Sequence, residues 1–418
     1  MKKPIKKNIL VKKAPVILKH TLDGIDPKLG RVFIPWALHH PLYLRTFVRM
    51  TFSHKRTERL RAKELEGGLR VPPFLILSIT HRCNLHCAGC FAKATGTISN
   101  GQKNRLNNDT QAKIKTPLDL NGWRKIIKDA SELGVFGFVI AGGEPFLFPG
   151  LIDLCNEFRD RFFLILTNGT TITEEDYRRL RRLSNIAIIV SVEGGQELTD
   201  SRRGSGVYEQ AINTLKRLEK IGVLTGVSVT INRMNFEYWM DQGHIDTLIS
   251  HGIRIAAFIE YIPLTPSIDS EPTGPDGSLD NMNNMGGWCI KNDHDLMLNK
   301  KEREKFRSQM LNFRATKPIY LIHSPGDEEY FGGCVSAGRG FAHVTPAGDL
   351  TPCPISNIAT HNLATEKLRD GLKSPLFKEI CENEQLLETD GMPCALFAHP
   401  KEVDELAKAV GAYRTDQD

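Results

Sequence analysis

Three cysteines stand close together in the stretch "ITHRCNLHCAGCFAK", at Cys83, Cys87 and Cys90. A structural zinc site uses four ligands, and no fourth Cys or His follows at a zinc-finger spacing, although His81 and His86 flank the loop. A cubic iron-sulfur cluster contains four irons, so three thiolates hold it and leave one iron open to an external ligand. The number and spacing of these thiols therefore favour a 4Fe-4S cluster over zinc.

Further polar motifs follow along the chain, and most of them come directly after a short apolar run. They are "GGEP", "TNG", "SVEG", the segment "DSRRGSG", and an asparagine that follows the run "LTGVSVTI". Glycine lets a ligand approach the backbone closely, while charged and amide side chains bind polar groups. These motifs contain Gly142, Gly143, Glu144, Pro145, Ser191, Glu193, Arg203 and Asn232.

The elements that must position these motifs are short apolar runs that alternate with amphipathic helical patterns. The runs cover residues 73–80, 136–142, 162–169, 186–194, 224–231 and 254–262. Near-continuous apolar strands alternating with helices predict the α/β class, with a parallel sheet covered by helices. Six such units fit a curved, partly open (β/α)6 barrel better than a closed eight-stranded one. Because chemistry in parallel α/β folds lies beyond the carboxyl ends of the strands, one rim is expected to collect the motifs.

The cysteine spacing together with "GGEP" after the next strand resembles the signature of the radical S-adenosylmethionine (SAM) superfamily, over about residues 72–265. The resemblance implies that Cys83, Cys87 and Cys90 hold the cluster and that SAM chelates its open iron. It also implies that the reduced cluster cleaves SAM to a 5′-deoxyadenosyl radical, which abstracts hydrogen from a substrate.

The same resemblance implies roles for the other motif residues. The "GGEP" glycines would allow close backbone approach to the methionine amino group, and Glu144 would accept its hydrogens. Ser191 and Glu193 would lie near the ribose and the methionyl carboxylate, Arg203 would pair with that carboxylate, and Asn232 would make a polar contact to SAM. Ordinary turn or cap chemistry is the alternative for the last four residues.

The residue before the third cysteine departs from the family pattern. Relatives frequently place an aromatic there to pack on the adenine, whereas this chain has Gly89 at that position and Phe91 after the cysteine. The resemblance therefore leaves open which side chain covers the adenine.

The last hundred residues contain "GGCVSAGRGFAHVTPAGDLTPCP" and two later cysteines. This segment resembles the opening of a SPASM or shorter twitch extension, in which a hairpin presents cysteines to an auxiliary 4Fe-4S cluster. "PAGDL" is a suitable turn for that hairpin. The full SPASM pattern carries seven cysteines, so one auxiliary cluster is expected here and two are not supported; structural thiols are the alternative. The expected ligands are Cys334, Cys353, Cys381 and Cys394, while Cys155 and Cys289 are expected to be core or loop thiols.

Composition and charge limit the possible size, location and redox state of the protein. The chain has 418 residues, 40% of them hydrophobic and 25% charged, which suits a globular protein of two or three domains. No apolar run approaches the roughly 18 residues of a membrane span, and the start lacks the apolar region of a signal peptide. The sequence therefore predicts a cytoplasmic protein, whose nine cysteines are metal ligands or reduced thiols rather than disulfides.

The chain divides by composition into four expected regions. A basic arm occupies residues 1–71, the barrel 72–265, a polar insertion and helix 266–317, and the auxiliary-cluster domain 318–418. The polar tracts 95–117 and 263–293 are either lids over the substrate or surface excursions.

The basic arm carries 17 Lys and Arg against 5 Asp and Glu in residues 1–70, mixed with Trp36, Tyr43 and Phe47. Such a segment is typical of a surface helix facing a membrane or an acidic partner, and peripheral membrane contact is one expectation. The alternative is that the aromatics pack on the next domain while the charges stay solvated. Nothing else in the sequence indicates a nucleic-acid partner, and none is expected.

Three functions are compatible with these motifs. The first is radical modification of a peptide or protein, the commonest role among SPASM-like relatives, with ferredoxin or flavodoxin as electron donor. The second is radical modification of a small metabolite, a cofactor precursor or a lipid. The third is a non-enzymatic iron-sulfur electron carrier, which leaves the SAM-like motifs unexplained.

Overall fold

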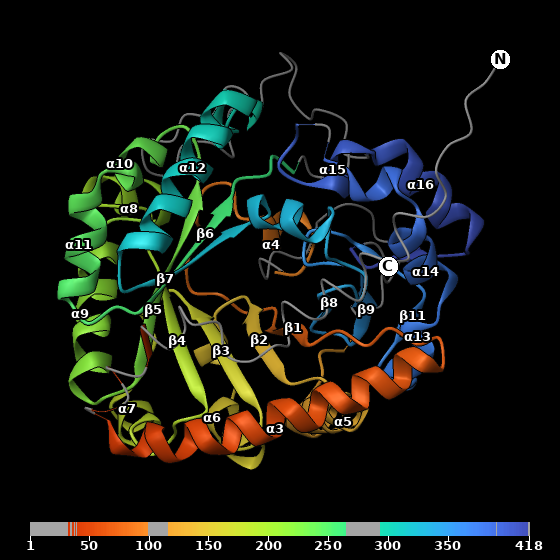
Figure 1. Cartoon of the computed structure of the whole chain (residues 1–418), viewed down its shortest axis with the longest axis horizontal. Helices are drawn as coiled ribbons and strands as arrows, with labels where there is room; N and C mark the ends of the chain where they lie inside the picture. The colour runs from red at the N-terminus through yellow and green to blue at the C-terminus, as the bar shows by residue number, and fades with distance from the viewer. Residues whose placement is uncertain are drawn as a thin grey trace, which may run out of the picture.

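The computed structural model describes residues 32–33, 36, 38, 40–98, 116–264, 293–389 and 391–416. A curved ten-stranded sheet forms its centre and helices surround it, as Figure 1 shows. Most of the two predicted polar tracts lies outside the described residues, as do Cys289 and the chain before residue 32.

Six parallel strands form the middle of the sheet, and each pairs with the next one along the chain. They follow the six apolar runs of the sequence to within a few residues at their ends, so the predicted parallel α/β sheet is confirmed. The strands are β1 (Phe74–Thr80), β2 (Gly137–Gly142), β3 (Phe162–Thr167), β4 (Ile186–Ser191), β5 (Leu224–Ile231) and β6 (Ile255–Glu260).

The sheet continues beyond these six strands at both edges. At one edge β7 (Tyr320–Ser324) pairs in parallel with β6, and at the other β8 (Phe341–Val344) pairs in parallel with β1. The sheet therefore crosses the predicted boundary at residue 318, because the C-terminal region supplies strands to both edges of the barrel.

The predicted "PAGDL" hairpin is present. Strands β8 and β9 (Asp349–Thr351) are antiparallel, and Gly348 closes the turn with a φ of +95°, a conformation that favours glycine. The short strand β11 (His361–Asn362) pairs with β9 and ends the sheet.

Helices cover the outer face of the sheet, and local sequence signals set their ends. In α5 (Leu120–Leu133) the Asp119 carboxylate accepts the N–H of Gly122, and Gly134 ends the helix in the left-handed conformation. The apolar faces of these helices bury the outward side chains of the strands and form the main core. The other covering helices are α6 (Leu151–Glu157), α7 (Glu174–Leu180), α8 (Gln196–Arg203), α9 (Val207–Lys220), α10 (Phe236–Met240), α11 (Gln242–Ser250) and α12 (Lys300–Thr316).

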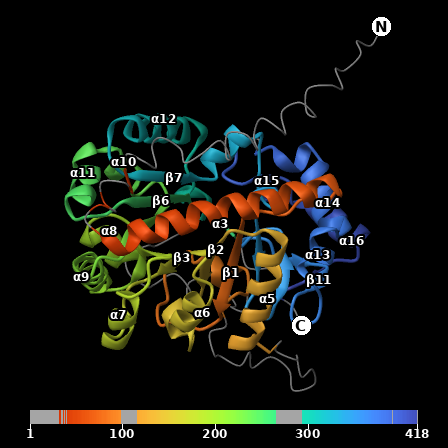
Figure 2. The same cartoon turned by 60° about the horizontal axis from the view of Figure 1, so that its bottom comes forward.

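Helix α3 (Pro41–Glu66) lies across the end of the barrel where the strands begin (Figure 2). The Tyr43 hydroxyl accepts the N–H of Leu224 at the start of β5, and Ser53 donates to the carbonyl of Asp160 before β3. The Arg61 guanidinium donates to the carbonyl of Gly134 before β2. The helix thus forms a floor under several strands, and Tyr43 packs inward, as the packing alternative for the arm's aromatics predicts.

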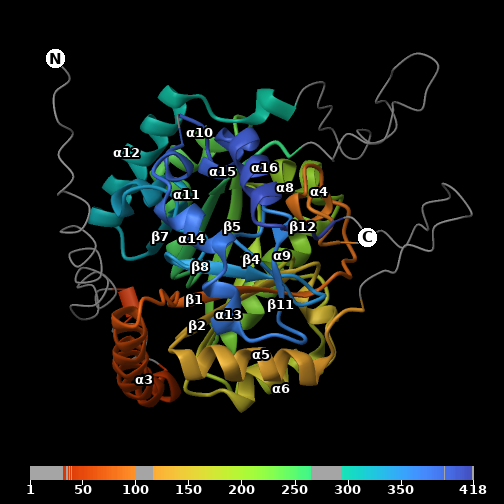
Figure 3. The same ribbon diagram turned by 90° about the vertical axis from the view of Figure 1, so that its right-hand side faces the viewer.

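The C-terminal helices gather beside β8 and β9 (Figures 1 and 3). They are α13 (Leu368–Leu372), α14 (Pro375–Glu382), α15 (Ala395–Ala398) and α16 (Pro400–Ala409). A two-stranded sheet of β10 (Ile358–Ala359) and β12 (Tyr413–Arg414) joins the chain end to this region. Among the described residues, no helix is both long and apolar enough to cross a membrane.

Candidate active site

The loop between β1 and the short helix α4 (Phe91–Ala94) carries the first three cysteines at the carboxyl rim of the barrel. All three are partly exposed. Burial raises the pKa of the Cys83 thiol to about 11, the N–H of Leu85 opposes that shift, and the neighbouring thiols Cys87 and Cys90 add to it.

The donor chemistry of this loop fits a 4Fe-4S cluster. One short loop supplies three thiols, and their partial exposure would let a further ligand reach a group bound to them. In the part of the chain that the structure describes, no three His, Cys, Asp or Glu side chains surround a point closely enough for a single metal ion. A four-iron cube is wider than one ion, so its thiolate ligands stand farther apart.

The "GGEP" segment is joined to the cysteine loop by its backbone. The N–H of Gly143 donates to the carbonyl of Thr80 at 2.8 Å, and the N–H of Glu144 donates to the carbonyl of Arg82 at 2.8 Å. A Cβ on Gly143 would lie 2.0 Å from the Arg82 carbonyl oxygen, so only glycine fits there. This contact fixes the cysteine loop against the end of β2.

The Glu144 carboxylate is buried and serves the turn after β3. It accepts the Thr167 hydroxyl at 2.7 Å, the Asn168 N–H at 2.8 Å and the Phe146 N–H at 3.1 Å. Burial raises the pKa of Glu144 although these hydrogen bonds oppose the shift. Its carboxylate therefore positions the "TNG" turn, while its contact with the SAM amino group stays a prediction.

Asn84, which the sequence reading missed, ties the cysteine loop to the same turn. Its amide donates to the Thr170 hydroxyl at 2.8 Å, and its carbonyl oxygen accepts the Asn168 amide at 2.8 Å. Its place directly after the first cysteine was the only signal that the sequence offered.

Glu193 in "SVEG" is the centre of a buried ion-pair network. Its Oε1 lies 2.5 Å from Arg202 Nη1 and 2.6 Å from Arg203 Nη2, and the carboxylate is fully buried. Its Oε2 accepts the N–H of Thr230 at 3.1 Å. Arg203 thus pairs with Glu193 in the structure, and its predicted pairing with the SAM carboxylate remains a prediction.

Arg202 was not singled out from the sequence, yet it connects this network to the cysteine loop. Its Nη2 donates to the carbonyl of Gly89 at 3.4 Å, and its own carbonyl accepts the N–H of Ala88 at 2.9 Å. Burial lowers the pKa of Arg202, but the charges of Glu193 and of the Cys87 and Cys90 thiolates outweigh burial and raise it. The guanidinium is thus a fixed positive charge beside the candidate cluster.

The two remaining motif residues make local contacts. The Ser191 hydroxyl lies 3.0 Å from that of Ser228 on the adjacent strand. The side-chain oxygen Oδ1 of Asn232 accepts the N–H of Met234 at 2.8 Å, and the side-chain nitrogen Nδ2 donates to the backbone carbonyl of Thr230 at 3.2 Å. Asn232 therefore shapes the turn after β5, as the turn alternative predicts, and a contact to SAM from either residue stays a prediction.

Tyr261 occupies the space that Gly89 leaves open. A Cβ at Gly89 would lie 2.7 Å from Cε2 of the Tyr261 ring, and Gly89 has a φ of +60°. The tyrosine directly follows β6 and is buried, whereas Phe91 is 42% exposed. An aromatic ring thus stands beside the third cysteine, but it comes from a distant part of the chain.

The C-terminal cysteines form a second group, and three of them are buried together. The charges of Cys394 and Cys334 both influence the pKa of Cys353, which burial raises strongly. Burial likewise raises the pKa of Cys394 to about 12. Three thiols at one buried point fit three ligands of an auxiliary cluster.

Cys381, the fourth predicted ligand, is set apart from this trio. Its thiol donates to the carbonyl of Ala337 at 3.0 Å, and the charges that influence its pKa are those of Arg70, Arg339 and Glu382. A carboxylate lies closer to the trio: Glu328 hydrogen-bonds Cys334, and burial raises its pKa to about 7.

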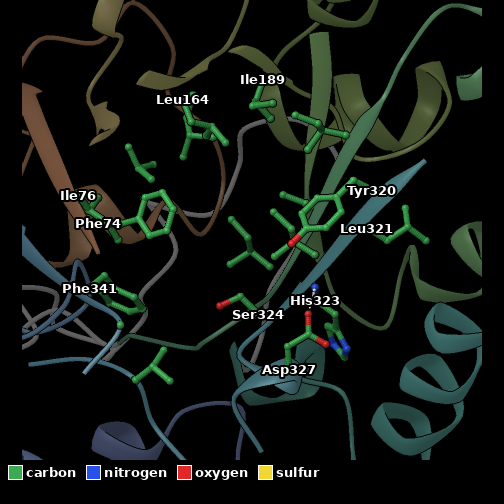
Figure 4. Close-up of a pocket in the computed structure, with 18 of the residues that line it drawn as sticks. Phe74, Ile76, Leu164, Ile189, Tyr320, Leu321, His323, Ser324, Asp327 and Phe341 are labelled. Atoms are coloured by element: carbon green, nitrogen blue, oxygen red, sulfur yellow. Dashed lines mark hydrogen bonds between the residues drawn. The ribbon is translucent and has the colours of Figure 1, made fainter. Parts of the chain in front are cut away.

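The inner face of the barrel encloses a cavity of about 1980 Å³ (Figure 4). Gly89 and Phe91 of the cysteine loop line one end, and Tyr43 and His54 of α3 line the other. Cys334, Cys353 and Cys394 also border it. The loop that carries the first three cysteines and the C-terminal trio therefore border one continuous space.

The comparisons with known proteins agree with this geometry. Residues 77–244 match the model of the radical SAM superfamily. The crystal structure of SuiB from Streptococcus suis bound to its precursor peptide SuiA has a TM-score of 0.55 at 17% identity, covering 82% of this chain and 74% of that one, and shows the fold. The cysteine loop, the "GGEP" segment and the Glu193 network all lie within the residues that match the radical SAM model.

Two relatives illustrate how much of the chain similar proteins cover. The Fe-coproporphyrin III synthase of Methanosarcina barkeri is 27% identical over 43% of this chain, and the match spans only 42% of that relative. The PqqA peptide cyclase of Streptomyces rochei is 24% identical over 74% of this chain and 76% of its own length. The chain carries a radical SAM domain, whose cofactors are a 4Fe-4S cluster and SAM.

Proposed function

We propose that this enzyme holds its cluster through Cys83, Cys87 and Cys90 and abstracts hydrogen from a substrate that lies in the barrel cavity. The observation that carries the proposal is that the cysteine loop, the "GGEP" segment and the Arg202–Glu193 pair meet at one rim and open on one cavity. When bound, the reduced cluster and SAM supply a 5′-deoxyadenosyl radical, which becomes 5′-deoxyadenosine on taking the hydrogen.

The chain's own residues hold and shield this chemistry. Gly142 and Gly143 let the backbone of the cysteine loop approach the end of β2, while Arg203 presents a positive charge that Glu193 keeps in place. The barrel walls exclude water, which protects a radical from side reactions. Tyr261 is proposed to take the adenine-packing position that Gly89 leaves vacant.

The relatives' names support two substrate classes. The PqqA peptide cyclase acts on a peptide, and its match spans most of both chains, so a peptide is the first proposed substrate. A lipid is the second candidate, and the apolar cavity is the observation that favours it. We further propose one auxiliary cluster on Cys334, Cys353 and Cys394, with the fourth position taken by Cys381 or Glu328.

Anaerobic reconstitution with iron and sulfide, followed by SAM and dithionite, tests the core of the proposal. Wild-type protein is expected to release 5′-deoxyadenosine even without substrate, because reduction of the cluster suffices to cleave SAM. A ferredoxin or flavodoxin should replace dithionite as the electron donor. No 5′-deoxyadenosine from protein with a full complement of iron would overturn the assignment.

The outward face of α3 supports the proposed peripheral membrane contact. Phe52 is 71% exposed and Val48 53% exposed, although both are large and apolar. Basic side chains share this face at helical spacing, as in helices that lie on anionic membranes. The residues of this face are Arg45, Val48, Arg49, Phe52, Lys55, Arg56 and Arg59.

Flotation with anionic and neutral vesicles tests this contact. Wild-type protein is expected to bind anionic vesicles at low salt and to dissociate as salt rises, because screening shortens to about 10 Å at 0.1 M. Phe52→Ser should weaken binding about tenfold, since a Phe side chain gains about 1.5–3 kcal/mol from burial. Leu311→Ser, at a 38% exposed site on α12, is the matched control and should change nothing. Equal binding by both variants would contradict the proposal.

A further inference from the structure

The strands that line the barrel cavity show a pattern that a filled core would not show. In β3, Phe163 and Ile165 are fully buried, whereas Phe162, Leu164 and Leu166 between them stay partly accessible. Successive side chains of a strand point to opposite faces of the sheet. The accessible set therefore faces the inside of the barrel, where these side chains pack on one side against the inner cluster around Tyr43 and Ile189 and stay partly accessible on the other.

Other strands repeat this pattern around the barrel. Phe74 of β1 and Ile259 of β6 are each 39% exposed, although both line the cavity and neither lies on the outer surface of the sheet. In a closed barrel such inward side chains pack against one another in layers. Here the opposing walls stand apart and leave apolar surface uncovered.

Aliphatic side chains from six strands line much of the cavity, beside a smaller number of polar and aromatic ones such as Ser78 and Tyr320. We name these aliphatic side chains the aliphatic belt, and Figure 4 shows three of its members, Ile76, Leu164 and Ile189, together with the cavity. The register of the sheet places Ile76, Val139 and Leu164 at one height, and Ala257 level with Ile322. Ile189 stands one step farther along, level with Leu166. The belt consists of Ile76, Val139, Leu164, Ile189, Ala257 and Ile322.

This chemistry favours one kind of occupant. A peptide would bring an N–H and a C=O with every residue, and each such group needs a hydrogen-bond partner when it is buried. The belt carries no polar side-chain atom, and the backbone groups of these strands already pair within the sheet. A hydrocarbon chain has no such requirement and gains from covering apolar surface.

The size of the cavity agrees with a long chain. Its volume of about 1980 Å³ exceeds the roughly 300–1,000 Å³ of pockets for drug-sized ligands. The eight residues of β5 span about 26 Å at about 3.3 Å per residue. That length accommodates a chain from one leaflet of a bilayer, which is about 15 Å deep, half of a hydrocarbon core of about 30 Å.

We propose that the barrel cavity binds the hydrocarbon chain of a membrane lipid along the barrel axis and presents it to the rim that carries the cysteine loop. The other end of the cavity reaches Lys55 of α3, which belongs to the outward face proposed to contact a membrane. The inference rests on the proposed function and selects the second of its two substrate classes, the lipid, for that same site.

Displacement of a dansyl-labelled fatty acid from full-length, reconstituted protein tests the inference. Wild-type protein is expected to bind this probe saturably, and palmitate should displace it. Ala257→Trp narrows the belt and should weaken probe binding more than about tenfold, and Leu164→Gln should weaken it about tenfold by making the wall polar. Leu311→Gln on α12, outside the cavity, is the matched control and should bind as wild type.

Three outcomes would overturn the inference: no saturable binding, equal binding by Ala257→Trp and the control, or displacement by an apolar peptide but not by palmitate. Phosphatidylglycerol vesicles form a second arm, in which transfer of the probe from vesicle to protein shows that a membrane supplies the chain. Release of 5′-deoxyadenosine with dithionite is measured in parallel on the same preparations. Failure of probe binding with normal SAM cleavage contradicts the lipid inference alone, whereas failure of SAM cleavage contradicts the proposed function.

Discussion

The loop after β1 and the C-terminal trio Cys334, Cys353 and Cys394 border one cavity, yet the fold holds the two groups of thiols differently. Cys83, Cys87 and Cys90 stand partly exposed on a loop that is fixed by backbone hydrogen bonds to the "GGEP" segment. Cys353 and Cys394, in contrast, are 5% and 8% exposed. A partly open trio leaves room for an exchangeable ligand at the fourth iron, whereas a buried trio suits a cluster that stays fully enclosed.

The largest expected effect separates the two groups by activity. Cys83→Ala, Cys87→Ala and Cys90→Ala should each reduce 5′-deoxyadenosine release to background, because two thiolates leave the cluster undercoordinated. The measurement is product formation by anaerobic reconstituted protein, with Cys155→Ala, a buried core thiol, as the control. If any of the three loop variants released as much 5′-deoxyadenosine as wild-type protein, that cysteine would not be a ligand of the SAM-cleaving cluster.

A second prediction concerns iron content. Two clusters give about eight irons per chain, and Cys353→Ala should lower the content to about four while SAM cleavage persists. Loss of the buried thiol also leaves a small void, so the free energy of unfolding should fall by about 1 kcal/mol. The triple alanine variant of the loop should likewise keep about four irons. If that variant keeps none while remaining folded, the C-terminal cysteines are structural thiols.

The smallest expected effect concerns which side chain is the fourth ligand of the C-terminal cluster. If Cys381 stays where the structure places it, Cys381→Ser should change the iron content by less than about one iron per chain. Glu328→Gln should instead alter the electron paramagnetic resonance spectrum of the auxiliary cluster, because the carboxylate lies against Cys334. If Cys381→Ser instead lowers the iron content and Glu328→Gln leaves the spectrum unchanged, Cys381 moves to join the trio when the cluster forms.

The sequence was informative where side-chain periodicity decides the structure. The six apolar runs became β1 to β6 because continuous β-branched segments bounded by glycine and helix caps leave little choice of conformation. Cys83 and "GGEP" were found because their spacing is set within single loops, where sequence distance and spatial distance agree.

Residues brought together by tertiary packing were not predictable in the same way. Arg202 contacts Gly89 across 113 positions of the chain, and Tyr261 fills the space above Gly89 from the far side of the barrel. The same limit applied to the basic arm, because the sequence does not show which of its aromatic side chains face inward and which face outward. Only the fold shows that Tyr43 faces the cavity while Phe52 faces outward.

The floor formed by α3 has a consequence for how the chain matures during translation. The hydroxyl of Tyr43 pairs with Leu224, which is 181 positions later. At a synthesis rate of about 5–20 residues per second, α3 waits roughly 10–40 s before that partner emerges from the ribosome. The partners of its later turns, Gly134 and Asp160, emerge sooner, so the helix is covered in stages and its first turn last, when the fifth strand docks.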